Sequence, residues 1–211
     1  MQIKRKNFVR GDAATVPSGV AIGALNNRFG WANQADFDND VDVLNYALTL
    51  EYLEAEFYRQ GNEAGLLNGK EAEYLAAVQR DEESHVSTIM QTVQQVGGQP
   101  VAAPAVDFGD AFSSREKYLT LSHTFENVGV QAYLGAAGFI SDKKLLQAAA
   151  GIFGVEARHA AIVGNLLGLK AEGGVFMGDF ETPLSKDDVL AAIQPFLAGP
   201  AAAGGDAAVT L

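Results

Sequence analysis

Apolar residues recur at intervals of three and four along four stretches of the chain, which is the spacing of one face of an α-helix. In the second stretch, for example, Leu75, Val78 and Ile89 fall on one such face. The pattern predicts an all-α protein with four long helices, over residues 40–60, 69–96, 114–137 and 141–167.

Residues suited to helix capping support these starts. Ser113 or Ser114 can accept a hydrogen bond from the first turn of the third helix, and Asp142 can do so for the fourth. In the segment "FETPLSKDDVLAAIQPFLAG", Ser185 can cap a short further helix whose end is disturbed by Pro195. We expect this C-terminal segment to cover one end or one side of the long helices.

The lengths of the connections predict how the helices are joined. About ten residues link the first two helices and about five link the last two, so each pair should form a hairpin. Between the pairs lies the segment "GGQPVAAPAVDFGDAFS", which can span roughly 50 Å at about 3.3 Å per residue. A helix of about 20 residues is only about 30 Å long. Two helical hairpins joined by one long crossover are typical of the ferritin-like four-helix bundle.

Each predicted helix carries a glutamate inside its apolar stripe, near the middle of the helix. A solvated glutamate normally lies on the opposite, polar face. Four exceptions at similar depth indicate a shared role for these residues, which are Glu51, Glu82, Glu126 and Glu156.

The two halves of the chain repeat one another. The stretch "TLEYLEAEFY" aligns with "TFENVGVQAY", so that Glu51 and Tyr58 correspond to Glu126 and Tyr133. In the same register, the Glu-x-x-His motif of Glu82 and His85 corresponds to that of Glu156 and His159. Residues three apart share a helix face, so each motif can offer an oxygen and a nitrogen to one metal ion. Antiparallel packing would then bring four carboxylates and two imidazoles together, and two divalent cations would balance the four negative charges.

With these motifs, the chain resembles the ferritin-like di-metal carboxylate superfamily and is closest to its desiccation-related ferritin-like domain proteins. The resemblance spans roughly residues 38–198 and includes "LNYALTLEYLEAEFY", both Glu-x-x-His motifs and "FETPLSKDDVLAAIQPFL". It implies two bound iron ions, or alternatively two manganese ions or a mixed pair. By matching position, the implied metal ligands are Glu51, Glu82, His85, Glu126, Glu156 and His159. Glu82 and Glu156 would bridge the two ions.

The repeat also argues against other acidic residues as ligands. Asp81 and Glu83 flank Glu82, but their counterparts are Val155 and Ala157, which places both on the surface side. Glu54 and Glu56 have Gly129 and Gln131 as counterparts, so neither is expected to be a ligand.

Three further features of the sequence each allow two interpretations. Tyr58 and Tyr133 are either core aromatic residues or lie beside the ligands, hydrogen-bonded to a carboxylate or available for electron transfer. His123 corresponds to Leu48, which favours a packed or hydrogen-bonding histidine over a ligand. The Ala- and Gly-rich stretches "YLGAAG" and "QAAAGIFG" favour close helix packing over a ligand cavity.

Composition narrows the choice of partners. The formal net charge of −11 argues against nucleic acid or an anionic membrane surface. The chain has no cysteine, which excludes thiolate ligands and disfavours a rubrerythrin-like peroxidase with its own electron-relay domain. After the N-terminal segment, no apolar run is long enough to span a bilayer. Metal ions with dioxygen or peroxide remain the expected partners, and a homo-oligomer is left open.

Residues 1–37 are interpreted either as an N-terminal arm or as a degenerate export signal. Lys4, Arg5 and Lys6 precede a weakly apolar stretch in the order of a twin-arginine signal, but Asp12 and Pro17 interrupt that stretch. The signal would imply an exported or periplasmic protein, and the arm a cytoplasmic one. The remaining segments are predicted to be a bundle (38–170), an extension with a short helix (171–198) and a flexible tail (199–211).

Two functional hypotheses follow. The first is a redox protein that handles dioxygen or peroxide at a di-metal site, ferroxidase-like or peroxide-detoxifying, in stress protection. The second is a non-catalytic desiccation- or stress-protective scaffold in which the metal is structural or absent.

Overall fold

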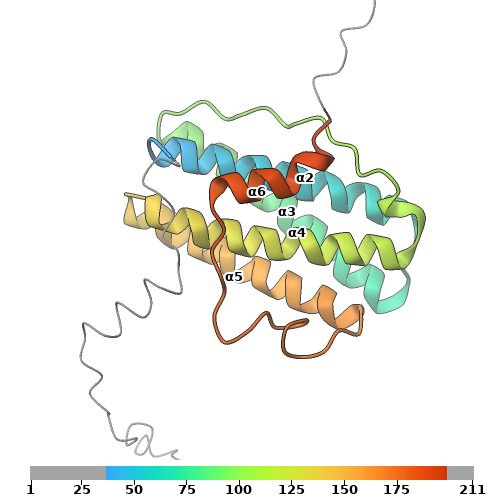
Figure 1. Ribbon diagram of the computed structural model, residues 1–211. Helices are drawn as coiled ribbons and strands as arrows, with labels where there is room; N and C mark the ends of the chain where they lie inside the picture. The colour runs from blue at the N-terminus through green and yellow to red at the C-terminus, as the bar shows by residue number, and fades with distance from the viewer. Residues whose placement is uncertain (1–36, 199–211) are drawn as a thin grey trace, which may run out of the picture. The chain divides into compact units, whose positions relative to one another are not determined.

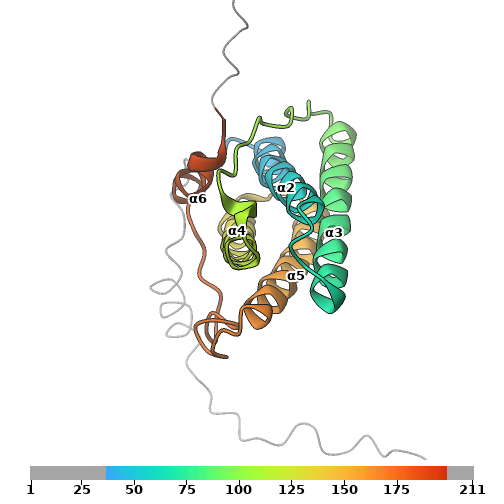
Figure 2. The ribbon, with the colours of Figure 1, turned by 90° about the vertical axis from the view of Figure 1, so that its right-hand side faces the viewer.

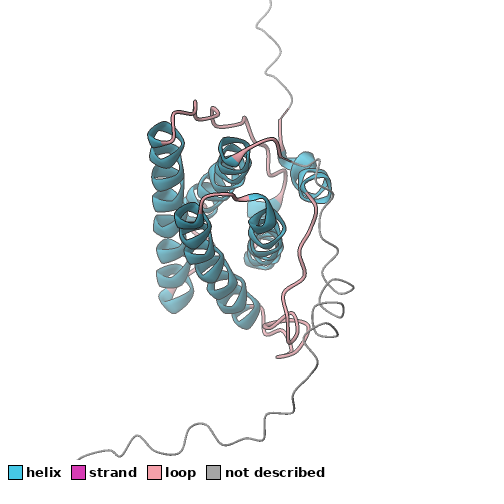
Figure 3. Ribbon diagram, turned by 90° about the vertical axis from the view of Figure 1, so that its left-hand side faces the viewer, coloured by secondary structure: helices cyan, strands magenta, loops and turns pink. Residues whose placement is uncertain are grey.

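A computed structural model describes residues 37–198, in which every long helix expected from the sequence is present (Figure 1). The helices end within a few residues of the predicted limits. Within the described residues no β-strand forms, and the fold is all-α (Figure 3). The long helices are α2 (Asp40–Glu63), α3 (Gly69–Gln95), α4 (Arg115–Ala136) and α5 (Lys143–Leu166), and a short helix α6 (Lys186–Ile193) follows.

Side-chain caps fix the starts of these helices. The Ser114 side chain accepts a hydrogen bond from the backbone N–H of Lys117 (3.2 Å), and Asp142 accepts one from Lys144 (2.6 Å). Both caps confirm the sequence-based expectation. Asn39 caps α2 in the same way, which the sequence pattern had not indicated.

The helices pair as two hairpins, α2 with α3 and α4 with α5, and the long crossover joins α3 to α4 (Figure 2). The side-chain amide of Asn45 in α2 binds the start of the crossover through both its nitrogen and its oxygen. It donates to the Gln99 carbonyl (3.0 Å) and accepts from the Val101 N–H (2.9 Å). The start of the crossover is therefore held against α2.

The C-terminal extension lies along α4. The backbone N–H of Leu184 donates to the Gln131 carbonyl (3.1 Å), and α6 packs against α4. Beyond α6, the chain pairs with the crossover: Asp107 donates to the Phe196 carbonyl (2.9 Å), and Ala198 donates to that of Ala105 (2.9 Å). The extension thus covers one side of the bundle and closes over the crossover.

The core has two unlike parts. The larger contains an aromatic cluster centred on Phe57, whose ring lies 5.0 Å from Phe125 and 5.2 Å from Phe108 between centroids. The smaller is built on aliphatic residues such as Leu48 and Val93. No helix within residues 37–198 is long and apolar enough to cross a membrane. The predictions of an N-terminal arm or export signal and of a flexible C-terminal tail concern residues 1–36 and 199–211, which lie outside the described residues.

Candidate metal centre

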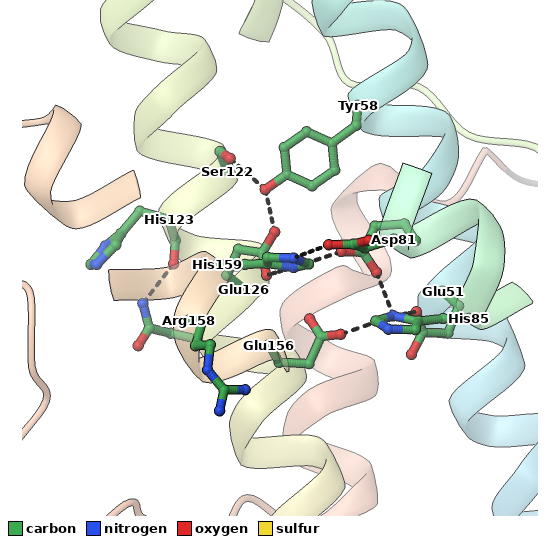
Figure 4. Close-up of polar contacts among 12 residues, drawn as sticks. Glu51, Tyr58, Asp81, His85, Ser122, His123, Glu126, Glu156, Arg158 and His159 are labelled. Atoms are coloured by element: carbon green, nitrogen blue, oxygen red, sulfur yellow. Dashed lines mark hydrogen bonds and ion pairs between the residues drawn. The ribbon is translucent and has the colours of Figure 1, made fainter. Parts of the chain in front are cut away.

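The glutamates in the apolar stripes meet in the middle of the bundle. Each comes from a different long helix, and all four are completely buried. The two histidines of the Glu-x-x-His motifs are buried beside them. The structure therefore brings all six predicted ligands into one cluster, of Glu51, Glu82, His85, Glu126, Glu156 and His159. Figure 4 shows the labelled members of this cluster, all but Glu82, turned toward one another.

The first half of the cluster surrounds His85. Its Nδ1 atom lies 3.1 Å from Glu51 Oε2, 3.0 Å from Glu82 Oε2 and 3.2 Å from Glu156 Oε1. Glu51, Glu82, His85 and Glu156 offer ligand atoms that all lie within 4.8 Å of one another. This is one possible metal position.

The second half surrounds His159. Its Nδ1 atom lies 2.8 Å from Glu82 Oε1 and 3.4 Å from Glu126 Oε2. Together with Glu156 these residues form a second group within the same 4.8 Å limit. Glu82 and Glu156 belong to both groups, which is the arrangement that two bridging carboxylates require.

Tyr58 and Tyr133 lie beside this cluster. Each hydrogen-bonds to a glutamate of the other hairpin, and that glutamate, here called an outer carboxylate, belongs to only one of the two ligand groups. Tyr58 of α2 donates a short hydrogen bond to Glu126 Oε1, and Tyr133 of α4 donates one to Glu51 Oε1. Ser122 Oγ lies 2.6 Å from the Tyr58 hydroxyl. In both carboxylates the second oxygen faces a histidine of the cluster, so each tyrosine leaves that oxygen directed to where a metal ion would bind. Burial raises the pKa of both tyrosines, which keeps them protonated as donors.

Burial and charge shift the ionisable groups strongly. Burial raises the pKa of Glu51 to about 7 and that of Glu156 well above its usual value. Burial also acts to raise the pKa of Glu82, but the two histidines outweigh it and lower that pKa to about 2. Burial lowers the pKa of each imidazole, yet the carboxylates raise it to about 12 for His85 and about 11 for His159. Without metal, protons on the imidazoles balance part of the buried negative charge.

Several buried polar atoms of the cluster lack a hydrogen bond, although some lie at ion-pair distance from one another. Within residues 37–198, these atoms are Glu82 Oε1, Glu126 Oε2, both carboxylate oxygens of Glu156, and His159 Nδ1. Unsatisfied buried atoms of this kind are costly, and all are potential metal ligands. Carboxylate oxygen and imidazole nitrogen suit divalent iron or manganese, and two such ions would balance four carboxylates. The residues present therefore fit a di-metal site.

Asp81 has a role that the repeat did not indicate. Its Oδ2 atom lies 3.2 Å from His159 Nε2, the ring nitrogen that points away from the cluster. The Asp81 side chain is 53% exposed, so its predicted surface position is correct, but it also orients the imidazole. Its counterpart Val155 cannot do this for His85. The sequence offered one signal for this role, an acidic residue next to Glu82 on the surface side of the helix.

Glu54 is a further buried carboxylate that the repeat argument had set aside. It is 3% exposed and lies outside both ligand groups. A Cβ atom on Gly129 would lie 3.2 Å from Glu54 Oε1 and 3.4 Å from Glu156 Oε2, so Glu54 occupies space that Gly129 leaves open. Burial, reinforced by Glu156, raises the pKa of Glu54 well above its usual value. The sequence did carry a signal for the burial of Glu54, which was missed: a glutamate in one half of the repeat corresponds to a glycine in the other.

The other rival residues lie outside the cluster. Glu56 pairs on the surface with Arg59, at 2.6 Å. Glu83 is exposed. His123 Nε2 lies 3.0 Å from the Gly174 carbonyl, which confirms its interpretation as a hydrogen-bonding histidine.

The fold and the site together define a class, namely a helical bundle whose buried glutamate and histidine residues are compatible with a pair of metal ions. Residues 39–169 match the family described as the ferritin-like domain. The match covers more than half of the 211 residues, and the chain belongs to this family. No curated protein matches the chain. Assignment to the desiccation-related branch stays a prediction.

Proposed function

We propose that the chain binds two iron ions in this cluster and uses them in redox chemistry with dioxygen or peroxide. The activity would be ferroxidase-like or peroxide-detoxifying and would serve stress protection. Two manganese ions or a mixed pair are the alternative occupants. The observation that carries the proposal is the sharing of Glu82 and Glu156 between two buried four-residue groups.

The chain's own residues would divide the work between two positions. Glu51 and His85 would hold one ion and Glu126 and His159 the other, with Glu82 and Glu156 contacting both. A bound pair of redox-active ions would supply two electrons to dioxygen or peroxide. The tyrosines fix one oxygen of each outer carboxylate, and Asp81 fixes the ring of His159. The burial of the cluster keeps bulk water away.

A specific observation supports the non-catalytic scaffold as the second candidate. His85 and His159 form ion pairs with the carboxylates, and the carboxylates raise the pKa of both imidazoles. The cluster can therefore balance part of its charge with protons when no metal is bound.

Metal loading followed by turnover separates the two candidates. The chain is purified with a chelator and loaded anaerobically with Fe(II) or Mn(II), and bound metal is counted by mass spectrometry. We expect two ions per chain and consumption of added dioxygen or peroxide by the loaded protein. Loading without consumption would favour the scaffold, and absence of loading would contradict the di-metal site itself.

A further inference from the structure

A small apolar pocket lies between the four long helices, at the end of the bundle where α4 gives way to α5. Its volume is about 50 Å³, and its wall is almost entirely apolar. Ala132 and Ala136 of α4 and Ala148 and Ala149 of α5 contribute to the wall. Both Ala-rich stretches therefore border a pocket, and the expectation that they favour close helix packing over a ligand cavity stays a prediction.

The pocket ends one helical turn from the candidate metal ligands. Ile89 lies four residues after His85, Ala47 four before Glu51, and Ile152 four before Glu156, and all three line the wall. Tyr133 also lines it, and its hydroxyl donates to Glu51. The pocket thus adjoins the Glu51–His85 position. At its outer side, the exposed Thr88 and Ala148 open it to solvent between α3 and α5.

The repeat relates this pocket to equivalent positions at the opposite end of the bundle, which are filled with large side chains. In the register of the repeat, Phe57 replaces Ala132, Tyr118 replaces Val43 and Leu75 replaces Ala149. All three large residues are completely buried. The Tyr118 ring packs so closely that a Cβ atom on Gly61, the counterpart of Ala136, would lie 2.2 Å from it. The helices can therefore pack without a gap at these positions, whereas small side chains leave a space at the end of the bundle that carries Val43, Ala132 and Ala149.

The chemistry of the wall selects among small molecules. A cavity volume of about 10–15 Å³ is enough for one water molecule, so about 50 Å³ has ample room for a diatomic molecule. The Tyr133 hydroxyl is bonded to Glu51, and the Thr92 hydroxyl donates to the Thr88 carbonyl (2.8 Å). Hydrogen peroxide would have to give up its hydrogen bonds to water there, whereas dioxygen has none to give up.

We infer that this pocket admits and holds dioxygen and that it serves the Glu51–His85 metal position rather than the Glu126–His159 position. The reaction of dioxygen at the Glu51–His85 position rests on the proposed function. The binding of dioxygen in the pocket does not. Reduction of dioxygen to hydrogen peroxide takes two protons and two electrons, one electron from each of two ferrous ions.

The direct test uses dissolved dioxygen itself on the metal-free protein. Dioxygen is paramagnetic, so it speeds the relaxation of methyl groups near which it resides. Methyl relaxation is measured under oxygen and under argon. Ile89 and Ile152 should show an enhancement several-fold larger than their counterparts Val163 and Val78, which are fully or almost fully buried. Equal enhancement of methyl relaxation at the isoleucines and at the valines would overturn the inference. So would the finding that a second copy of the chain covers the pocket in solution.

Two matched variants tie the effect to the pocket. Ala149→Leu copies Leu75, which stands at the equivalent position at the packed end of the bundle, and Ala150→Leu places the same side chain on the exposed face of α5. Ala149→Leu should abolish the enhancement at Ile152, and Ala150→Leu should retain it. Retention of the enhancement in Ala149→Leu would contradict the assignment.

Kinetics on the iron-loaded protein test the use of the gas. Ala149→Leu should slow the oxidation of Fe(II) by dioxygen several-fold, leave its oxidation by peroxide unchanged, and still bind two ions. An equal loss with both oxidants would overturn the selectivity. Failure of the wild type to bind metal would sink the proposed function, while the relaxation result would still decide whether dioxygen occupies the pocket.

Discussion

The two hairpins carry the same ligands in different surroundings. Each supplies an outer glutamate, a shared glutamate, a histidine and a tyrosine at equivalent positions. Around them the halves differ: Asp81 contacts His159 while Val155 gives His85 no such partner, and Glu54 faces Gly129. The repeat therefore fixes what the site can bind, and the departures from the repeat make its two positions unequal.

Removing a shared carboxylate should have the largest effect. Glu156→Ala should abolish binding of the ion pair, because Glu156 belongs to both groups. For the wild type, metal at about 100 times its Kd stabilises the fold by about 2.7 kcal/mol, which raises Tm by roughly 5–10 °C. Melting curves with and without Fe(II) or Mn(II) measure the shift. His123→Ala should keep it, and a full shift in Glu156→Ala would refute the role of this residue.

Removing an outer carboxylate should affect one position only. Glu51→Ala and Glu126→Ala should each bind one ion where the wild type binds two, because each residue belongs to a single group. Bound metal is counted after removal of excess ion. Loss of both ions from either variant would show that the two positions fill only together.

Glu54→Gln should stabilise the metal-free protein increasingly as pH rises. The pKa of Glu54 is raised in the folded state, so the folded protein binds the proton more tightly than the unfolded chain. Above the unfolded pKa this carboxyl therefore costs stability, by up to about 1.4 kcal/mol per pH unit until the folded pKa is reached. Urea unfolding of both proteins between pH 5 and 8 measures the difference.

Glu56→Gln is the control of opposite sign for that measurement. The hydrogen bond from Arg59 lowers the pKa of Glu56, so this carboxylate contributes stability above its unfolded pKa. Its replacement should destabilise the protein slightly at neutral pH. A stability difference for Glu54→Gln that does not change with pH would contradict its assignment as a buried acid.

The smallest effect is expected at Asp81. Asp81→Asn should weaken metal binding at the His159 position by about ten-fold, the low end for a residue that orients a ligand, because the side chain is half exposed. Titration calorimetry measures the two affinities. Glu83→Gln, exposed on the same helix, should leave both unchanged, and equal weakening at the two positions would argue against a local effect of Asp81.

The helices and the grouping of the six cluster residues were predictable because both depend on local periodicity. Residues three apart on a helix share a face whatever surrounds them, so the doubled Glu-x-x-His motif carried the prediction. The reciprocal bonds of Tyr58 and Tyr133 depend on how far α2 and α4 are staggered, which no local pattern contains. Glu54 lies outside both ligand groups, as expected, but its burial was not predicted, because burial there depends on the space that Gly129 leaves open.

The pairing of the crossover with the last described residues has a consequence for the order of synthesis. The Phe196 ring lies 4.9 Å from that of Phe125 and 6.3 Å from that of Phe108, between centroids. A growing chain can complete all four long helices before this ring has been added. Until translation reaches residue 196, the aromatic cluster lacks the Phe196 ring, and the nascent bundle exposes apolar surface that can drive aggregation.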